Sequence, residues 1–232
     1  MVEKPNDIHG VVTFLDVLGW KGVYDRQPDA IANLTRLIAG VMTRAKEQQR
    51  GRILREVVVK SISDTIAIFT FCADDETSLA IEIHGELCSW LIPASIDAEL
   101  PMRGATAFGE FEVHENIFVG KAVDEAAAWH EQGDWIGIHL TPSAEFVFKA
   151  IATRGVWTEY SPPTKNRLGW KPHCVNWTRD WSDRPKEIGH IKNKFRQLGP
   201  IVPEIAGKFI NTLLFVEAMN PEPEVAPAIR SV

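Results

Sequence analysis

The sequence has little cysteine and no excess of basic residues, and these two shortages exclude several classes of protein. Its 232 residues include only three cysteines, Cys72, Cys88 and Cys174, with no C-x-x-C pair. An odd, widely spaced set predicts buried free thiols in a reducing compartment, without a disulfide framework or a zinc site. The formal net charge is −6, whereas sequence-independent nucleic-acid binding needs a basic surface. We therefore expect no nucleic-acid partner.

Long hydrophobic runs are also missing from the sequence. No apolar stretch reaches the roughly 18–20 residues of a membrane span, and the first ten residues lack the apolar segment of a signal peptide. These features predict a cytoplasmic protein without a membrane partner. With 45% hydrophobic residues, the chain is long enough for one sizeable core, alone or with an appendage.

Hydrophobic periodicity predicts strands and helices in alternation along the chain. The expected strands are 10–17, 53–60, 64–72, 101–110, 111–119 and 135–140, with one or two more within 155–181. Residues 53–60 and 64–72 are expected to form a hairpin, and residues 101–110 and 111–119 another strand pair. The expected helices are 28–49, 73–92, 120–133, 141–155 and 200–219. Because the helices interrupt antiparallel strand pairs, we expect an α+β, ferredoxin-like sandwich with a mostly antiparallel sheet and helices packed on one face.

The same pattern divides the chain into three expected parts. Residues 1–150 would form the core, and residues 151–219 a strand and helix extension packed on that core. Residues 220–232 are rich in proline and are expected to form a flexible tail.

Two aspartates occupy unusual positions within apolar runs. Asp16 lies near the end of the first strand, and Asp64 lies between the two strands of the hairpin. In a ferredoxin-like sheet the first strand is central and borders this hairpin, so the two acids are expected to meet. Adjacent carboxylates repel each other unless one is protonated or a cation lies between them. Mg²⁺ or Mn²⁺ is the natural partner of such a pair.

Ordinary roles for these aspartates also remain open. A single aspartate at a strand end is commonly a helix cap or a turn residue, and SISDT fits a hairpin turn. The pair favours a metal site more than either acid does alone. The segment after Asp16, LGWKG, adds two glycines and Lys21, whose backbone N–H groups and charge suit a phosphate.

Four segments in order resemble the motifs of class III nucleotidyl cyclases. FLDVLGW resembles the F-x-D-x-x-G-F signature of their first strand, and KSISDTIAIF resembles the hairpin of the second metal-binding aspartate, with Ser63 where glycine is common. RGATAFGE and FVGKAVDEAAAW resemble the next strand and the start of the next helix. The resemblance covers roughly residues 8–140. It extends to the compact bacterial branch that includes the pyrimidine cyclases of the Pycsar antiphage system.

This resemblance implies a cyclase-like core at residues 1–150 and a homodimer with sites built across the interface. The implied reaction converts UTP to 3′,5′-cyclic UMP and pyrophosphate, and the product would signal phage infection to a separate effector. Asp16 and Asp64 would be the catalytic acids, and with the Val17 carbonyl they would hold two Mn²⁺ or Mg²⁺ ions. The implied substrate-binding residues are Phe14, Lys60, Arg103 and Lys21.

The sequence departs from the cyclase pattern on the helix that follows. Asp124 replaces the family's transition-state asparagine, and Ala128 replaces its arginine. Either another cation supplies that charge, with Arg103, Arg44 and Lys21 as candidates, or the site is inactive. Arg103 is equally consistent with a structural strand residue.

The base that the protein would cyclise is left open by the sequence. Lys60 lies where adenylate-specific relatives keep a base-reading lysine, but a lysine only donates and therefore suits adenine or uracil. The second base-reading position falls near Asn116 or Ile117, and neither is the acid expected for adenine. An adenylate cyclase, or an inactive nucleotide-binding or dimerisation module, are the alternatives.

Overall fold

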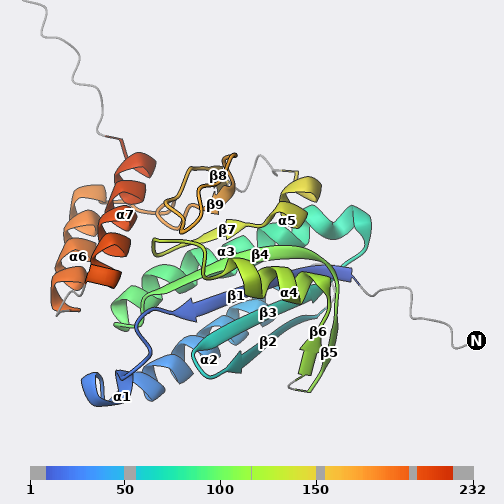
Figure 1. Cartoon of the computed structure of the whole chain (residues 1–232), viewed down its shortest axis with the longest axis horizontal. Coiled ribbons are helices and arrows are strands. Elements are labelled where there is room, and N and C mark those ends of the chain that lie inside the picture. The colour runs from blue at the N-terminus through green and yellow to red at the C-terminus, as the bar shows by residue number, and fades with distance from the viewer. Residues whose placement is uncertain (1–8, 50–55, 116, 150–154, 199–202, 222–232) are drawn as a thin grey trace, which may run out of the picture.

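A seven-stranded sheet organises the protein (Figure 1). The computed structural model describes residues 9–49, 56–115, 117–149, 155–198 and 203–221. The strands are β1 (His9–Val17), β2 (Val57–Ile62), β3 (Thr65–Phe71), β4 (Met102–Glu110), β7 (Ile138–Leu140), β8 (Trp157–Glu159) and β9 (His173–Val175). Their order is β2-β3-β1-β4-β7-β9-β8, and each neighbouring pair is antiparallel except β4 with β7. The mostly antiparallel sheet and the central first strand are therefore confirmed.

A second, two-stranded sheet lies apart from the main one. It consists of β5 (Glu112–His114) and β6 (Ile117–Val119), which pair with each other. The expected pairing of residues 101–110 with 111–119 is wrong, because β4 lies between β1 and β7. The first six residues of β4 are all buried, so this strand needs neighbours on both sides. The residues of β5 and β6 are mostly exposed and do not need neighbours on both sides.

The helices differ from their expected lengths mainly at their C-terminal ends. They are α1 (Val23–Arg26), α2 (Ala30–Gln49), α3 (Thr77–Asp97), α4 (Lys121–Trp129), α5 (Pro142–Val147), α6 (Arg184–Gln197) and α7 (Pro203–Met219), with a short 3₁₀ turn, η1 (Asp74–Glu76), before α3. The helix expected at 120–133 ends at Trp129, and the one expected at 141–155 ends at Val147. Residues 150–154 lie outside the described residues, as do 222–232 of the expected tail.

Alternation along β1 separates two hydrophobic cores. Val11 and Leu15 belong to the larger core, which includes the buried residues of α2 and α3. Val12 and Phe14 point to the opposite face and pack with buried residues of α4. The two long helices thus pack on one face, as expected, while α4 covers part of the other. Since side chains alternate along a strand, Asp16 follows Phe14 on the α4 side.

A buried polar network connects α3 to the centre of the sheet. His84 lies 2.8 Å from the Thr13 hydroxyl and 3.0 Å from the Thr70 hydroxyl, through its two ring nitrogens. Thr13 in turn lies 2.7 Å from the hydroxyl of Thr106. Burial lowers the pKa of His84 to about 3, so the ring is neutral and serves as both donor and acceptor. The network fixes α3 against three adjacent strands.

The C-terminal helix α7 packs against the loop that leads into β7. Phe215 contacts Trp135, with ring centroids 4.7 Å apart. Lys208 forms a 3.0 Å ion pair with Asp134, and Asn211 donates a 2.7 Å hydrogen bond to the Asp134 carbonyl. Residues more than seventy positions apart therefore hold this loop in place. Within the described parts of the chain, no helix is both long and apolar enough to cross a membrane.

Candidate active site

The two aspartates lie together where β1 ends beside the β2–β3 turn. Asp16 is paired with Thr65, and the Val17 amide donates a 3.3 Å hydrogen bond to the Asp64 carbonyl. The pKa of Asp16 is raised from 3.8 to about 6, first by burial and next by the charge of Asp64. The pairing of β1 with β3 thus brings the two expected acids together.

The conformation of the hairpin turn presents Asp64 at this position. Ile62 and Thr65 pair directly, so only Ser63 and Asp64 form the turn. Ser63 has a φ of 54°, in the left-handed region that favours glycine. This backbone requirement explains why the resembling cyclase motif commonly has glycine here.

Arg103 lies opposite Asp16 on the neighbouring strand β4. Its Nη2 atom is 3.9 Å from Asp16 Oδ2, and its Nη1 atom donates to the carbonyls of Glu131 and Gly133 at 2.9 and 3.0 Å. Only 7% of the residue is exposed. Arg103 therefore has a structural role in holding the segment after α4, and it also places a positive charge beside Asp16.

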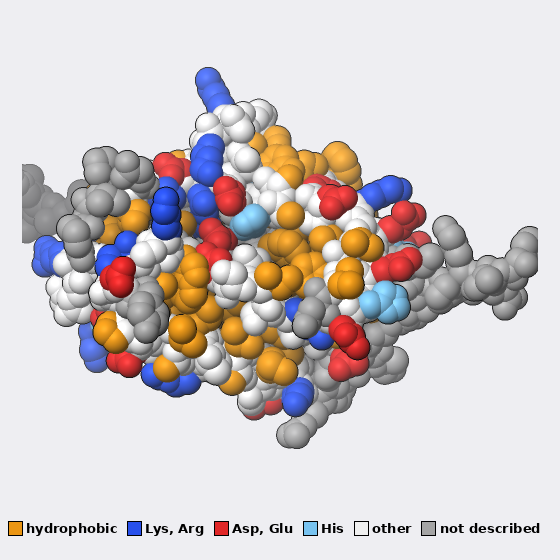
Figure 2. Space-filling model, turned by 60° about the horizontal axis from the view of Figure 1, so that its bottom comes forward, with side chains coloured by type: hydrophobic (Ala, Val, Ile, Leu, Met, Phe, Trp, Pro, Cys, Tyr) orange, Lys and Arg blue, Asp and Glu red, His pale blue; other side chains and the backbone are white. Residues whose placement is uncertain are grey.

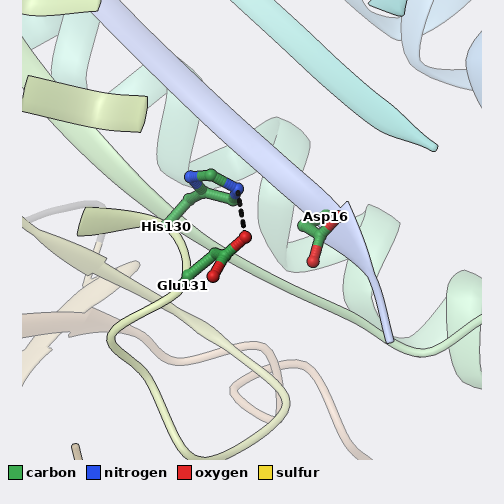
Figure 3. Close-up of side chains that lie close together, drawn as sticks. All are labelled: Asp16, His130 and Glu131. Atoms are coloured by element: carbon green, nitrogen blue, oxygen red, sulfur yellow. Dashed lines mark ion pairs between the residues drawn. The ribbon is translucent and has the colours of Figure 1, made fainter. Parts of the chain in front are cut away.

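Two residues of the site, His130 and Glu131, were missed by the sequence analysis. Asp16, His130 and Glu131 each offer one ligand atom, and these atoms all lie within 4.8 Å of one another. Asp16 stands at the end of β1, and the other two lie on the segment after α4 (Figure 3). The adjacent letters HE carry no recognisable ligand spacing, so only the fold reveals this cluster.

Lys60 and Phe14 lie on the same face as Asp16. Lys60 on β2 pairs with Ala67 on β3, and Ala67 pairs with Phe14 on β1. Lys60, Ala67 and Phe14 therefore lie in one row across the sheet. Lys60 is half-buried. Phe14 is 7% exposed and makes an edge-on contact with His130 at 6.3 Å. Phe14 is thus mainly a core residue beneath the site.

The two other candidate cations, Lys21 and Arg44, lie in different parts of the fold. Lys21 is exposed in the turn after β1, between Gly19 and Gly22, which both have a φ near 75°. Arg44 instead stacks over the ring of Trp90, 3.9 Å from its centroid, in the helical layer on the other face of the sheet. Lys21 therefore lies in the turn that follows Asp16, whereas Arg44 lies on the other face of the sheet.

The remaining positions of the cyclase pattern face solvent in this single chain. Asp124 and Ala128 are exposed on α4, and Ile117 is 69% exposed. Asn116 lies outside the described residues. The side chains of Asp124, Ala128 and Ile117 are therefore accessible from outside this chain.

The donor set at this edge of the sheet fits a hard divalent cation. It combines the carboxylates of Asp16 and Asp64 with the backbone of Val17, and oxygen atoms of this kind are the preferred ligands of Mg²⁺ and Mn²⁺. Burial of Asp16 and the nearby charge of Asp64 raise the pKa of its carboxyl group, because both disfavour the ionised form. A bound cation would instead favour the ionised form.

Comparison with known proteins identifies the fold. No family model matches the sequence, and no curated protein matches it. Among solved structures, adenylate cyclases from Trypanosoma brucei in their monomeric state match with a TM-score of 0.50 at 14% identity, over 77% of this chain and 92% of that one. The catalytic core of a rhodopsin-guanylyl cyclase with converted specificity, in complex with ATPαS, matches with a TM-score of 0.50 at 17% identity, over 74% and 98%. The fold is that of the class III cyclases.

Within the described residues, the sheet that carries the acids also extends beyond β7. The strands β8 and β9 add to the edge beyond β7, and α7 packs on the loop before β7. The cyclase-like sheet of this protein is therefore joined to its C-terminal elements by hydrogen bonds and by shared core residues.

Proposed function

We propose that this protein is a nucleotidyl cyclase. In the proposed reaction the ribose 3′-oxygen loses its proton and bonds to the α-phosphorus of a nucleoside triphosphate. The bond from the α-phosphorus to the bridging oxygen breaks, and pyrophosphate leaves. The observation that supports this most directly is the Asp16–Asp64 pair at the end of β1 in a cyclase fold.

The residues at this edge have distinct proposed roles. Asp16, Asp64 and the Val17 carbonyl would hold two Mg²⁺ or Mn²⁺ ions, which supply charge neutralisation and activation of the attacking oxygen when bound. The exposed turn at residues 18–22, with Lys21, would orient the phosphates through backbone N–H groups. Arg103 would add a fixed positive charge beside Asp16.

We propose UTP as the substrate and 3′,5′-cyclic UMP as the product. The support is the resemblance to the pyrimidine cyclases, together with the second base-reading position, which falls near Asn116 or Ile117, neither of them the acid expected for adenine. Lys60, on the same face as Asp16, would donate to a carbonyl of the base. The cyclic nucleotide would act on a separate effector in antiphage defence. An adenylate cyclase is the second candidate, which Lys60 also supports.

A homodimer is part of this proposal. The large hydrophobic side chains that are more than half exposed include Ile117 and Val119 on β6. One face of the molecule carries a broad group of hydrophobic side chains bordered by acidic residues and histidine (Figure 2). Burial of such a surface against a second copy is favourable. It would also bring a second chain to the exposed α4 positions. The three buried free thiols support a cytoplasmic location.

The test is incubation of the purified protein with ATP, GTP, CTP and UTP in turn, with Mn²⁺, followed by chromatography of the products. We expect cyclic UMP from UTP, and none from an Asp64→Asn variant. An Asp75→Asn variant, changed at an exposed position on η1, is the matched control and should remain active. Cyclic AMP instead would support the adenylate cyclase. No product from any nucleotide, in folded and metal-loaded protein, would favour an inactive binding module.

A further inference from the structure

We propose that His130 and Glu131 are additional ligands of the metal site that contains Asp16, so that the site includes one imidazole nitrogen. This inference rests on the proposed function, because it adds residues to the same site. It does not follow from the resemblance, whose implied ligands are two aspartates and a backbone carbonyl. It follows from how the segment after α4 is placed against the end of β1 (Figure 3).

The tautomer of His130 is set by its backbone contact. The Nδ1 atom lies 2.7 Å from the carbonyl oxygen of Ala127. A carbonyl only accepts, so Nδ1 carries the proton and donates it there. In the neutral ring the free lone pair is then on Nε2. Histidines that bind metal ions show this same arrangement, with the second nitrogen donating to a carbonyl or carboxylate.

The free nitrogen of His130 faces the acids of the cluster. Its Nε2 atom lies 3.9 Å from Glu131 Oε1, which is too long for a hydrogen bond. Two ligands held about 2.1 Å from one ion lie about 3 to 4 Å from each other. The 3.9 Å separation of these two atoms therefore suits ligands of a common ion better than hydrogen-bond partners. The Asp16 ligand atom lies within 4.8 Å of both, so a small adjustment of its side chain would complete the set.

The segment that carries the two residues is fixed to the rest of the fold. Arg103 donates to the Glu131 carbonyl from the sheet. On the other side, Lys165 donates its backbone N–H to the Gln132 carbonyl at 2.9 Å. The ammonium group of Lys165 lies 3.5 Å from Glu131 Oε2, the oxygen that does not face His130. The ligand atoms are thus positioned by contacts from two elements far apart in the sequence.

A nitrogen ligand changes which ions the site prefers. Mg²⁺ strongly favours oxygen ligands in regular octahedral geometry, whereas Mn²⁺ and the later first-row ions accept imidazole. The wild-type protein should therefore bind Mn²⁺ more tightly than Mg²⁺ in the absence of nucleotide. Removal of the imidazole should reduce Mn²⁺ affinity tenfold or more and should leave Mg²⁺ affinity nearly unchanged.

The test measures metal binding directly, without nucleotide. The metal-free protein is titrated with Mn²⁺ and the free ion is followed by electron paramagnetic resonance, then Mg²⁺ is used as a competitor. Pulsed spectroscopy of the bound Mn²⁺ should show coupling to a directly bound ¹⁴N nucleus, and His130→Ala should abolish it. His114→Ala and Glu112→Gln are matched controls, because these side chains are 82% and 63% exposed. Both should behave as the wild type.

A second pair of variants keeps the test decisive if His130→Ala is poorly folded. Glu131→Gln keeps the backbone carbonyl that Arg103 binds and should still weaken Mn²⁺ binding. Lys165→Ala removes the positive charge beside Glu131 and should strengthen it. Bound Mn²⁺ without nitrogen coupling in the wild type, or unchanged affinity in both Glu131→Gln and His130→Ala, would overturn the inference.

This result can be separated from failure of the proposed function. A wild-type protein that binds Mn²⁺ through nitrogen and forms no cyclic nucleotide would uphold the ligand assignment and contradict the cyclase. A protein that forms cyclic nucleotide while His130→Ala binds Mn²⁺ normally would uphold the cyclase and contradict the ligand assignment.

Discussion

Replacement of Asp16 by asparagine should stabilise the metal-free protein at neutral pH. In the folded chain the carboxylate is partly buried and lies beside Asp64, and its pKa is raised from 3.8 to about 6. The native state therefore holds a proton between these pH values that the unfolded state releases. Stability then falls as pH rises from about 4 to about 6, and the loss persists above that range.

The size of this effect follows from the change in pKa. A rise from 3.8 to about 6 corresponds to about 3 kcal/mol, at about 1.4 kcal/mol for each pKa unit. Because 18% of the Asp16 side chain is exposed, we expect solvent screening to reduce the gain to about 2 kcal/mol. Asparagine is nearly the same size and carries no charge, so Asp16→Asn should recover this amount at pH 8 and little of it at pH 4.

Urea denaturation in the presence of a chelator, at several pH values between 4 and 8, measures this difference. The quantity of interest is the stability of Asp16→Asn minus that of the wild type, in which contributions from titrating groups that do not interact with Asp16 cancel. Added Mn²⁺ should stabilise only proteins that keep Asp16. If the difference were absent at pH 8, the argument that Asp16 carries an uncompensated charge would be refuted.

Four further substitutions test the scaffold, and the free energy of unfolding of each variant is measured by urea denaturation. Gly104→Ala should destabilise the protein by about 1–3 kcal/mol, because the new Cβ would lie 2.3 Å from the Phe14 carbonyl oxygen. Gly189→Ala should instead stabilise the protein by about 0.5–1 kcal/mol, because Gly189 lies within helix α6 and its new Cβ would meet no other atom. His139 is fully buried and has no hydrogen-bond partner among the described residues, and burial lowers its pKa to about 4. The unfolded chain therefore binds a proton here that the folded chain does not, and the wild type loses stability as the pH falls from 6.5 to 4. His139→Leu should remove this loss. Asn211→Ala should cost about 1 kcal/mol through the lost bond to the loop before β7, and unchanged stability would contradict that role for α7.

Much of the sheet could be predicted from the sequence, because buried strands leave clear apolar runs. Residues 10–17 and the hairpin were identified in this way, and the structure places them side by side. The partner of 101–110 could not be deduced, since an apolar run does not say which strand lies next to it. Helix α6 was missed because it is largely polar, and only Ile191 and Phe195 of its residues are buried.

The candidate site was only partly predictable for a related reason. Asp16 and Asp64 can be recognised in the sequence, because each is a charged residue that interrupts an apolar run. His130 and Glu131 lie in a polar segment where histidine and glutamate are unremarkable. Their proximity to Asp16 depends on Arg103 and on the segment of Lys165, which hold the loop from other elements. Contacts of this kind exist only once the chain has folded.

The bond from Asn211 to Asp134 has a consequence for how the protein is made. These two residues are 77 positions apart. At a synthesis rate of about 5–20 residues per second, Asn211 is added about 4–15 s after Asp134. During that interval the nascent chain already contains both aspartates and the segment after α4, but it cannot secure the loop that follows. Each new molecule therefore passes through a stage of about 4–15 s in which the loop before β7 lacks its hydrogen bond from α7, and aggregation or chaperone binding would act at that stage.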